Sequence, residues 1–279
     1  MDNIPNKESV TGNLMKLVFT RIDYEDIIEV SANTLKEIKA KFPNSKILPR
    51  MLTKEDFNFR DYQNIIDLPE EIIKNSKCSA IYFEEMDMIV EVNQYFLRTI
   101  CKVNKEVYKN YEESILENTM LIFRILDNNE DVKIKRISVN KINEVLCSSA
   151  TKLKKIFKGN ILRMDLFDNI IKWNQISSKA KNFVAFDYND CNVNFLSLLE
   201  NVEAGKRYIR LLLDYEVYIY GDRSWNDKFN NENSIKQKYI EEKLKALNDI
   251  TYTLFIKSFT PKGLEMIRNN ERIDEYEAY

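Results

Sequence analysis

The residues of this chain that could do chemistry are carboxylates, lysines and tyrosines, because the sequence contains no histidine. Histidine is the usual general base near neutral pH and the commonest transition-metal ligand. Serine triads, Cys-His proteases and His-ligated zinc sites are therefore excluded within this one chain. The five glycines lie too far apart for a phosphate-cradling loop, so Walker and dinucleotide-binding motifs are absent as well.

Three aspartates are candidates for binding a divalent cation together. Asp187, Asp190 and Asp214 come from neighbouring predicted strands, and carboxylate oxygens are common ligands of such ions. A metal-dependent nuclease or phosphodiesterase is one hypothesis that follows. The acid-x-lysine spacing expected of such an enzyme within a strand is missing, so the sequence assigns no catalytic residue, no metal site and no cofactor.

Positive charge is concentrated in one part of the chain. Residues 133–163 contain nine basic side chains and one acid, a net +8, which leaves −10 for the rest of a chain whose total is −2. Such a surplus could hold a nucleic-acid backbone or an acidic protein partner, or it could be a solvated face beside a basic edge strand. The residues assigned to a partner or nucleic-acid surface are Lys133, Lys135, Lys141, Lys152, Lys154, Lys155 and Lys158.

The segment 131–145, DVKIKRISVNKINEV, opens this basic region and has the pattern of a strand. Its apolar residues alternate at Val132 and Ile134 and continue at Ile137 and Val139. The phase of the alternation therefore shifts by one residue between Arg136 and Ile137. An inserted residue moves every later side chain to the opposite face, so the pattern predicts a β-bulge at this point.

Arg136 and Asn143 are the two polar residues of this strand whose interaction partners have to be identified. An arginine in phase with the apolar residues before it would face the covered side of the sheet, where an unpaired guanidinium is costly. Arg136 then needs a carboxylate, and Asp187, Asp214 or Glu216 could supply it. A structural ion pair that fixes strand register is one interpretation and a ligand-facing arginine is the other. Asn143 is expected to bond backbone groups at a bulge or turn.

The surrounding elements predict an α+β fold, with a largely antiparallel sheet packed against long helices. Strands are expected at 14–22, at 131–145, within 167–188 and at 207–220, with a hairpin over 80–93. Helices are expected at 27–41, 68–75, 106–126 and 149–158, the last capped by Gly159, and from Ser234 to a stop at Pro261 and Gly263. The chain is expected to form a single unit, 1–279, or two intimate halves of about 1–147 and 148–268, with a frayed tail at 269–279.

Composition indicates the cellular setting. No apolar run approaches the length needed to span a bilayer, and the first residues are polar, so a cytoplasmic protein without a membrane partner is expected. The four cysteines, at 78, 101, 147 and 191, form no C-x-x-C pair. They are expected to be reduced and packed rather than to bind zinc.

The strand IKRISVNKINEV resembles the most recognisable stretch of a sporadically distributed family of uncharacterised bacterial proteins, which reads approximately I-x-R-I-G-x-R-Y-I-N-x-I. Arg136, Ile137, Ile142 and Asn143 match this pattern, and Ser138 stands where the family commonly has glycine. Asn140 and Lys141 replace its Arg-Tyr pair. Weaker matches are Phe42-Pro43 and Asp214. The resemblance implies one fold-sized unit and a patchy distribution like that of mobile or defence-associated genes, and it supplies no catalytic residues.

Three functions follow from these observations. The leading hypothesis is a non-enzymatic regulatory or interaction protein of a bacterial mobile or defence-type locus, which acts with a protein partner encoded nearby. The second is a nucleic-acid-binding module that uses the basic residues between 133 and 163. The third is the metal-dependent nuclease or phosphodiesterase built on aspartates.

Overall fold

A computed structural model describes residues 14–52, 77–104, 107–162, 180–204, 206–221, 233–269, 271 and 273 of the chain. The strands are β1 (Met15–Tyr24), β2 (Lys46–Met51), β3 (Lys77–Phe83), β4 (Met88–Asn93), β5 (Phe96–Lys102), β6 (Ile134–Cys147), β7 (Ala180–Tyr188), β8 (Cys191–Ala204) and β9 (Lys206–Tyr220). The helices are α2 (Ala32–Lys41), the short turn η1 (Glu84–Met86), the π-helical turn η2 (Glu112–Leu116), α5 (Glu117–Glu130), α6 (Ala150–Ile156), α7 (Gly159–Leu162), α10 (Asn233–Lys257) and α11 (Pro261–Arg268).

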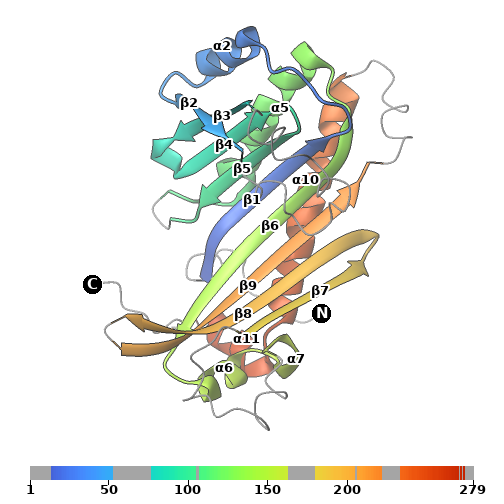
Figure 1. The fold of residues 1–279 in the computed structure, drawn as a ribbon. Coiled ribbons are helices and arrows are strands. Elements are labelled where there is room, and N and C mark those ends of the chain that lie inside the picture. Colours follow the sequence, from blue (N-terminus) through green and yellow to red (C-terminus); the bar gives the residue numbers. More distant parts are fainter. Residues whose placement is uncertain are drawn as a thin grey trace.

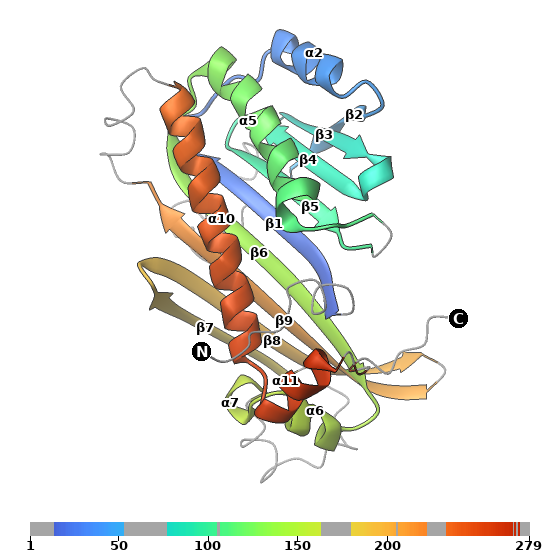
Figure 2. The ribbon, with the colours of Figure 1, turned by 180° about the vertical axis from the view of Figure 1, so that it is seen from behind.

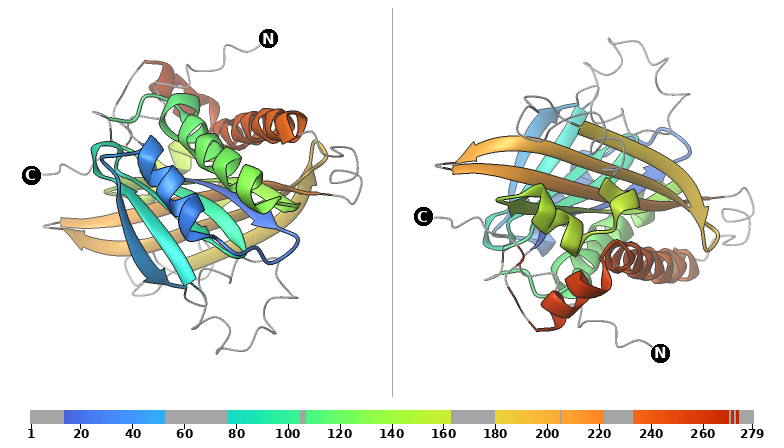
Figure 3. Two further views of the ribbon diagram at one scale, coloured as in Figure 1. Left: turned by 90° about the horizontal axis from the view of Figure 1, so that it is seen from above. Right: turned by 90° about the horizontal axis from the view of Figure 1, so that it is seen from below.

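The described strands form one antiparallel sheet in the order β2-β3-β4-β5-β1-β6-β9-β8-β7 (Figure 1). The long helices α5 and α10 lie side by side on one face of this sheet (Figure 2). Helix α2 packs against α5, and the views from above and below show α11 on the side of the sheet that α10 covers (Figure 3). This architecture confirms the predicted α+β class with a largely antiparallel sheet.

The order of the elements repeats once along the chain. Among the described elements, each half begins with a strand, β1 or β6, and continues through one or two short helices into an antiparallel meander. The last strand of each meander, β5 or β9, returns beside the first strand, and a long helix follows. Since β1 and β6 pair antiparallel in the middle of the sheet, the halves are related by an approximate two-fold axis between these strands. The repeat divides between residues 130 and 134, while the sheet runs through both halves without a break.

The main core lies between the sheet and the helices. Alternate residues of the central strands, such as Val18, Val139 and Val217, are fully buried there. Apolar residues of α5 and α10 complete this core, which stabilises the fold chiefly through apolar burial. Among the described helices, none combines the length and the apolar character that a bilayer crossing requires. All four cysteines are buried and unbridged, as expected.

The predicted bulge exists, but it lies one step earlier than the apolar pattern suggested. Asp23 of β1 pairs with Arg136, whereas the next residue, Tyr24, pairs with Ile134. Lys135 is therefore the inserted residue, and both Ile134 and Ile137 face the helices. Arg136 consequently points to the opposite face, which corrects the expectation that it stays in phase with Val132 and Ile134.

Several predicted boundaries differ from the structure for local reasons. Helix α2 begins at Ala32 because the Ser31 side chain caps it. Gly159 does not cap the preceding helix but opens α7, and Pro261 opens α11 at the position where a helix tolerates proline. Strands β2, β5 and β8 were not predicted. The expected helix 68–75 lies outside the described residues, as do residues 167–179 of the expected strand region and most of the tail 269–279.

Candidate functional site

A network of buried charges occupies the face of the sheet opposite the helices, at its centre. Arg136 has no exposed surface and pairs with Glu216 on the neighbouring strand β9. Asn194 Nδ2 donates a hydrogen bond to the other oxygen of Glu216 at 2.9 Å. The Arg136 guanidinium also lies 4.1 Å from the centroid of the Tyr218 ring and 4.0 Å from an oxygen of Asp23. Of the three carboxylates considered from the sequence, Glu216 is thus the partner of Arg136.

The network continues into the first half of the sheet. Arg21 Nε donates to Asp23 Oδ1 at 2.7 Å, and Arg98 Nε donates to Glu91 Oε2 at 2.5 Å. The buried Phe96 ring lies beside both arginines, 3.9 Å from the Arg21 guanidinium carbon and 5.3 Å from that of Arg98. Each buried positive charge therefore has a carboxylate in contact, which is the condition for tolerating ions in a protein interior.

A small cavity of about 90 Å³ lies within this network, between Arg21, Arg98, Asn140 and Asp214. The Oδ1 atom of Asn140 is buried, and no residue in the described part of the chain donates a hydrogen bond to it. The cavity has room for a few water molecules, and one of them could donate to this atom. Because its paired charges come from five strands, β4, β5, β1, β6 and β9, the network is best understood as a device that fixes strand register.

The other residues singled out from this region lie apart. Asp214 is buried next to the cavity, whereas Asp187 is exposed on the edge strand β7, two strands away. Asp190 lies in the turn between β7 and β8. Within the described ranges, no three acidic or thiol side chains lie close enough to share a metal ion. Asn143 sits opposite Met15 at a bulge of β1, but its buried Nδ2 makes no hydrogen bond.

The lysines between 133 and 158 fall into three separate places. Lys133 and Lys135 lie near the start of β6, where an ion pair of 3.0 Å with Asp26 raises the pKa of Lys133. Lys141 points to the helix-covered face. A third group lies beyond the other end of β6. It is about 40 Å from Lys133 and Lys135, since each strand residue advances ~3.3 Å. That group, which we call the α6 lysines, comprises Lys152, Lys154, Lys155 and Lys158.

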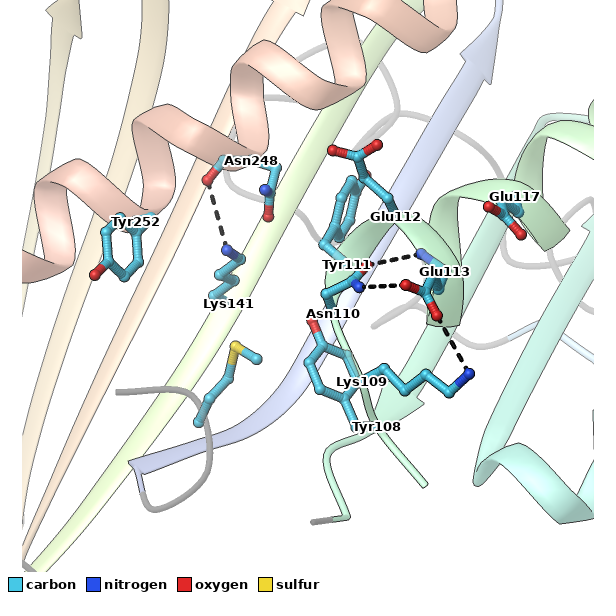
Figure 4. A pocket seen from close by; sticks show the side chains of 11 residues that line it. Tyr108, Lys109, Asn110, Tyr111, Glu112, Glu113, Glu117, Lys141, Asn248 and Tyr252 are labelled. Carbon is cyan, nitrogen blue, oxygen red and sulfur yellow. Dashed lines mark hydrogen bonds and ion pairs between the residues drawn. The ribbon is translucent and has the colours of Figure 1, made fainter. Parts of the chain in front are cut away.

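A cavity of about 390 Å³ opens on the helix-covered face (Figure 4). It lies between α10 and η2, above Met15 and Lys141. The Nζ atom of Lys141 reaches the Asn248 carbonyl at 3.5 Å. The buried Oδ1 of Asn248 accepts no hydrogen bond.

Tyrosines and carboxylates make up much of the remaining wall of this cavity. Tyr111 shares a 2.9 Å hydrogen bond with Thr20, and burial raises its pKa well above the ordinary value. Burial also raises the pKa of Tyr252, to about 12, so both phenols stay protonated at neutral pH. Lys109 and Glu113 pair with each other at the rim. The volume suits a small polar molecule, and no sequence signal indicated this cavity, because its walls come from four separate segments.

The two edges of the sheet differ in character. The edge strand β2 has six residues, which include Pro49 and the basic Lys46 and Arg50. These are features that natural proteins use to keep an edge from pairing. The other edge, β7, has nine residues and no proline. Its Phe183, Val184 and Phe186 keep 44%, 39% and 39% of their surface exposed.

Neither a known protein family nor a curated protein matches this sequence.

Proposed function

We propose that this chain is a non-enzymatic regulatory or interaction protein that acts with a protein partner, and that β7 receives an extended segment of that partner. The observation that supports the proposal is the exposed, apolar and proline-free outer edge of β7. Strand addition at such an edge supplies backbone hydrogen bonds for affinity and side-chain contacts for specificity. The resemblance noted for the Arg136 strand supports a bacterial mobile or defence-type locus.

The contrast between the two edges strengthens this interpretation. A long, apolar edge is an aggregation hazard that proteins normally suppress. In this chain β2 contains Pro49 and two basic residues, which hinder pairing at that edge. Strand β7 contains no proline and exposes apolar side chains. An edge left open in a chain that protects its opposite edge is expected to have a binding role.

The test is a substitution that blocks only the outer edge. Tyr188 pairs with Cys191 across the two-residue turn 189–190, so the backbone groups of Tyr188 point toward β8 and those of the odd-numbered residues point outward. Ala185→Pro therefore removes an outward N–H and leaves the ladder to β8 intact. We expect it to weaken binding of a partner encoded by an adjacent gene at least about tenfold, as measured by calorimetry with purified proteins.

Ala185→Ser is the matched control, since it changes the same position but keeps the N–H. It should bind the partner as the unchanged chain does, and partner binding should slow hydrogen exchange at Ala185 and Asp187. Full partner binding by a folded Ala185→Pro variant would contradict the proposal. So would the failure of every neighbouring gene product to bind.

Nucleic-acid binding is a second candidate, and the clustering of the α6 lysines favours it. Four ammonium groups gather on one short helix and the residues just after it. If they contact phosphates, log K for duplex DNA should fall with log salt at a slope of about −3.6.

Changing Lys152, Lys154 and Lys155 to Glu should abolish this binding, as measured by fluorescence anisotropy at several salt concentrations. Changing Lys133 and Lys135 to Glu is the control, because these residues lie at the far end of β6. It should leave the affinity nearly unchanged. Weak binding that does not respond to salt would exclude this candidate.

A further inference from the structure

The cavity between η2 and α10 lies where the two halves of the repeat meet. The first half contributes β1 and η2 to its walls, and the second half contributes β6 and α10. Ligand sites commonly form where two structural units leave a gap between them. A molecule bound in this cavity would therefore contact both halves of the sheet.

One wall of the cavity has an irregular backbone. The π-helical turn η2 leads directly into α5, and Tyr111, Glu112 and Glu113 at its start line the cavity. Single π-helical turns within a helical segment are rare, and they occur frequently at functional sites. The irregular turn thus coincides with the place where a ligand would lie.

The opposite wall carries a buried acceptor. Asn248 of α10 is 8% exposed, and no residue in the described part of the chain donates a hydrogen bond to its Oδ1 atom. Figure 4 shows its side chain directed from α10 into the gap toward η2. A buried acceptor without a donor costs free energy, and an N–H group of a bound molecule would offset this cost.

A cationic donor lies next to this acceptor. The Nζ atom of Lys141 is 3.5 Å from the main-chain carbonyl of Asn248. This contact is long for a hydrogen bond, so a ligand oxygen at a shorter distance would be a better acceptor. A ligand that satisfies both Asn248 and Lys141 has to present an N–H group beside a carbonyl oxygen.

The remaining walls favour a planar and neutral molecule. The rings of Tyr108, Tyr111 and Tyr252 line the cavity, and aromatic side chains offer surfaces on which another ring can pack. Three carboxylates outnumber two ammonium groups among the wall residues, which disfavours an anion such as a phosphate. These charged residues are Glu112, Glu113, Glu117, Lys109 and Lys141.

We propose that this cavity binds a nucleoside whose base carries a carbonyl beside a ring N–H, as guanine and uracil do. The ring N–H donates to Asn248 Oδ1, the carbonyl accepts from Lys141 Nζ, and the base packs against the tyrosines. A volume of about 390 Å³ is within the range of cavities that hold small molecules. The site goes beyond the proposed function and does not involve β7.

Calorimetry with the full chain tests the choice of ligand. Guanosine, uridine or both should bind, and the comparison of the two identifies the base. Adenosine and cytidine lack a carbonyl beside a ring N–H, so they should bind at least about tenfold more weakly. The monophosphates of guanosine and uridine should also bind more weakly than the nucleosides, because their phosphate approaches the carboxylates.

Two substitutions test the two polar contacts. Asn248→Leu and Lys141→Met should each weaken binding of the preferred nucleoside at least about tenfold. Lys238→Met is the matched control, since Lys238 is exposed on the same helix α10, and it should leave the affinity unchanged. Asn248→Leu removes an acceptor that lacks a donor, so its Tm should be no lower than that of the native chain.

Four results would each overturn the inference. They are no binding of any nucleoside up to about 1 mM, equal affinities for guanosine, uridine and adenosine, tighter binding of the monophosphates, and native affinity in a folded Asn248→Leu variant. Ala185→Pro should bind the nucleoside as the native chain does. The nucleoside site and the partner site at β7 can therefore fail independently.

Discussion

Arg136→Ala should destabilise the protein by about 3–5 kcal/mol, because it removes one member of a buried ion pair and leaves the other without its counter-charge. The Glu216 side chain is only 4% exposed, and among the described residues the Asn194 hydrogen bond is what would remain to it. Asp23 would keep Arg21 but lose the nearby Arg136 charge. The free energy of unfolding in urea measures the effect.

The same variant decides between the two interpretations of this arginine. If Arg136 fixes the register of β6 against β9, replacing both members of the pair by apolar residues, as in Arg136→Met with Glu216→Met, should destabilise less than either single change. If it instead served a ligand, its loss would leave stability unchanged or improve it. Arg124→Ala is the matched control, since the Arg124 side chain is 46% exposed and its partner Glu241 is 29% exposed. It should change the free energy of unfolding by less than about 1 kcal/mol.

Lys236→Met should lower the free energy of unfolding by a similar amount, about 3–5 kcal/mol. It removes an ion pair between α10 and α5. Lys236 pairs with Asp127, whose side chain has no exposed surface, and also donates to the Val132 carbonyl at 3.1 Å. The variant leaves a buried carboxylate with the Gln237 amide as its remaining donor, at 3.1 Å. Thermal and urea unfolding would measure the loss.

A matched change on the same helix provides the control. Lys245 of α10 is 40% exposed and pairs with Glu112 and Glu241. Lys245→Met should alter the free energy of unfolding by less than about 1 kcal/mol, because solvent screens exposed pairs. Combining Lys236→Met with Asp127→Asn should recover part of the lost stability. Equal effects of Lys236→Met and Lys245→Met would show that burial does not govern these ion pairs.

Sequence patterns predicted those strands and helices in which apolar residues recur at a regular spacing. The alternation in 207–220 predicted β9, and the hydrophobic spacing after Ser234 predicted α10. Strand β2 was missed because Pro49 looked like a turn residue, although an edge strand tolerates proline where no N–H is needed. Strand β8 was missed because its two faces are both substantially buried, which removes the simple alternation.

The candidate site was predicted in part. Arg136 was expected to need a carboxylate, and Glu216 was among those considered, since a buried guanidinium requires a counter-charge whatever the fold. The prediction of the face of the sheet on which Arg136 lies was wrong. That face depends on whether the bulge residue is Lys135 or a later one, and both alternatives leave the apolar spacing of the strand acceptable.

The sequence by itself determined the α+β class, the absence of histidine chemistry and the need to pair the Arg136 charge, because these follow from composition and local periodicity. Only the tertiary structure decided that the lysines of 133–158 lie in three places and that the halves repeat one topology. It also decided which strands lie at the edges of the described sheet. The physical reason is that strand neighbours are set by long-range backbone pairing, which side-chain period along the chain does not encode. The register across β6 and β9, and the place of β7 at one edge of the described sheet, exist only once those pairings have formed.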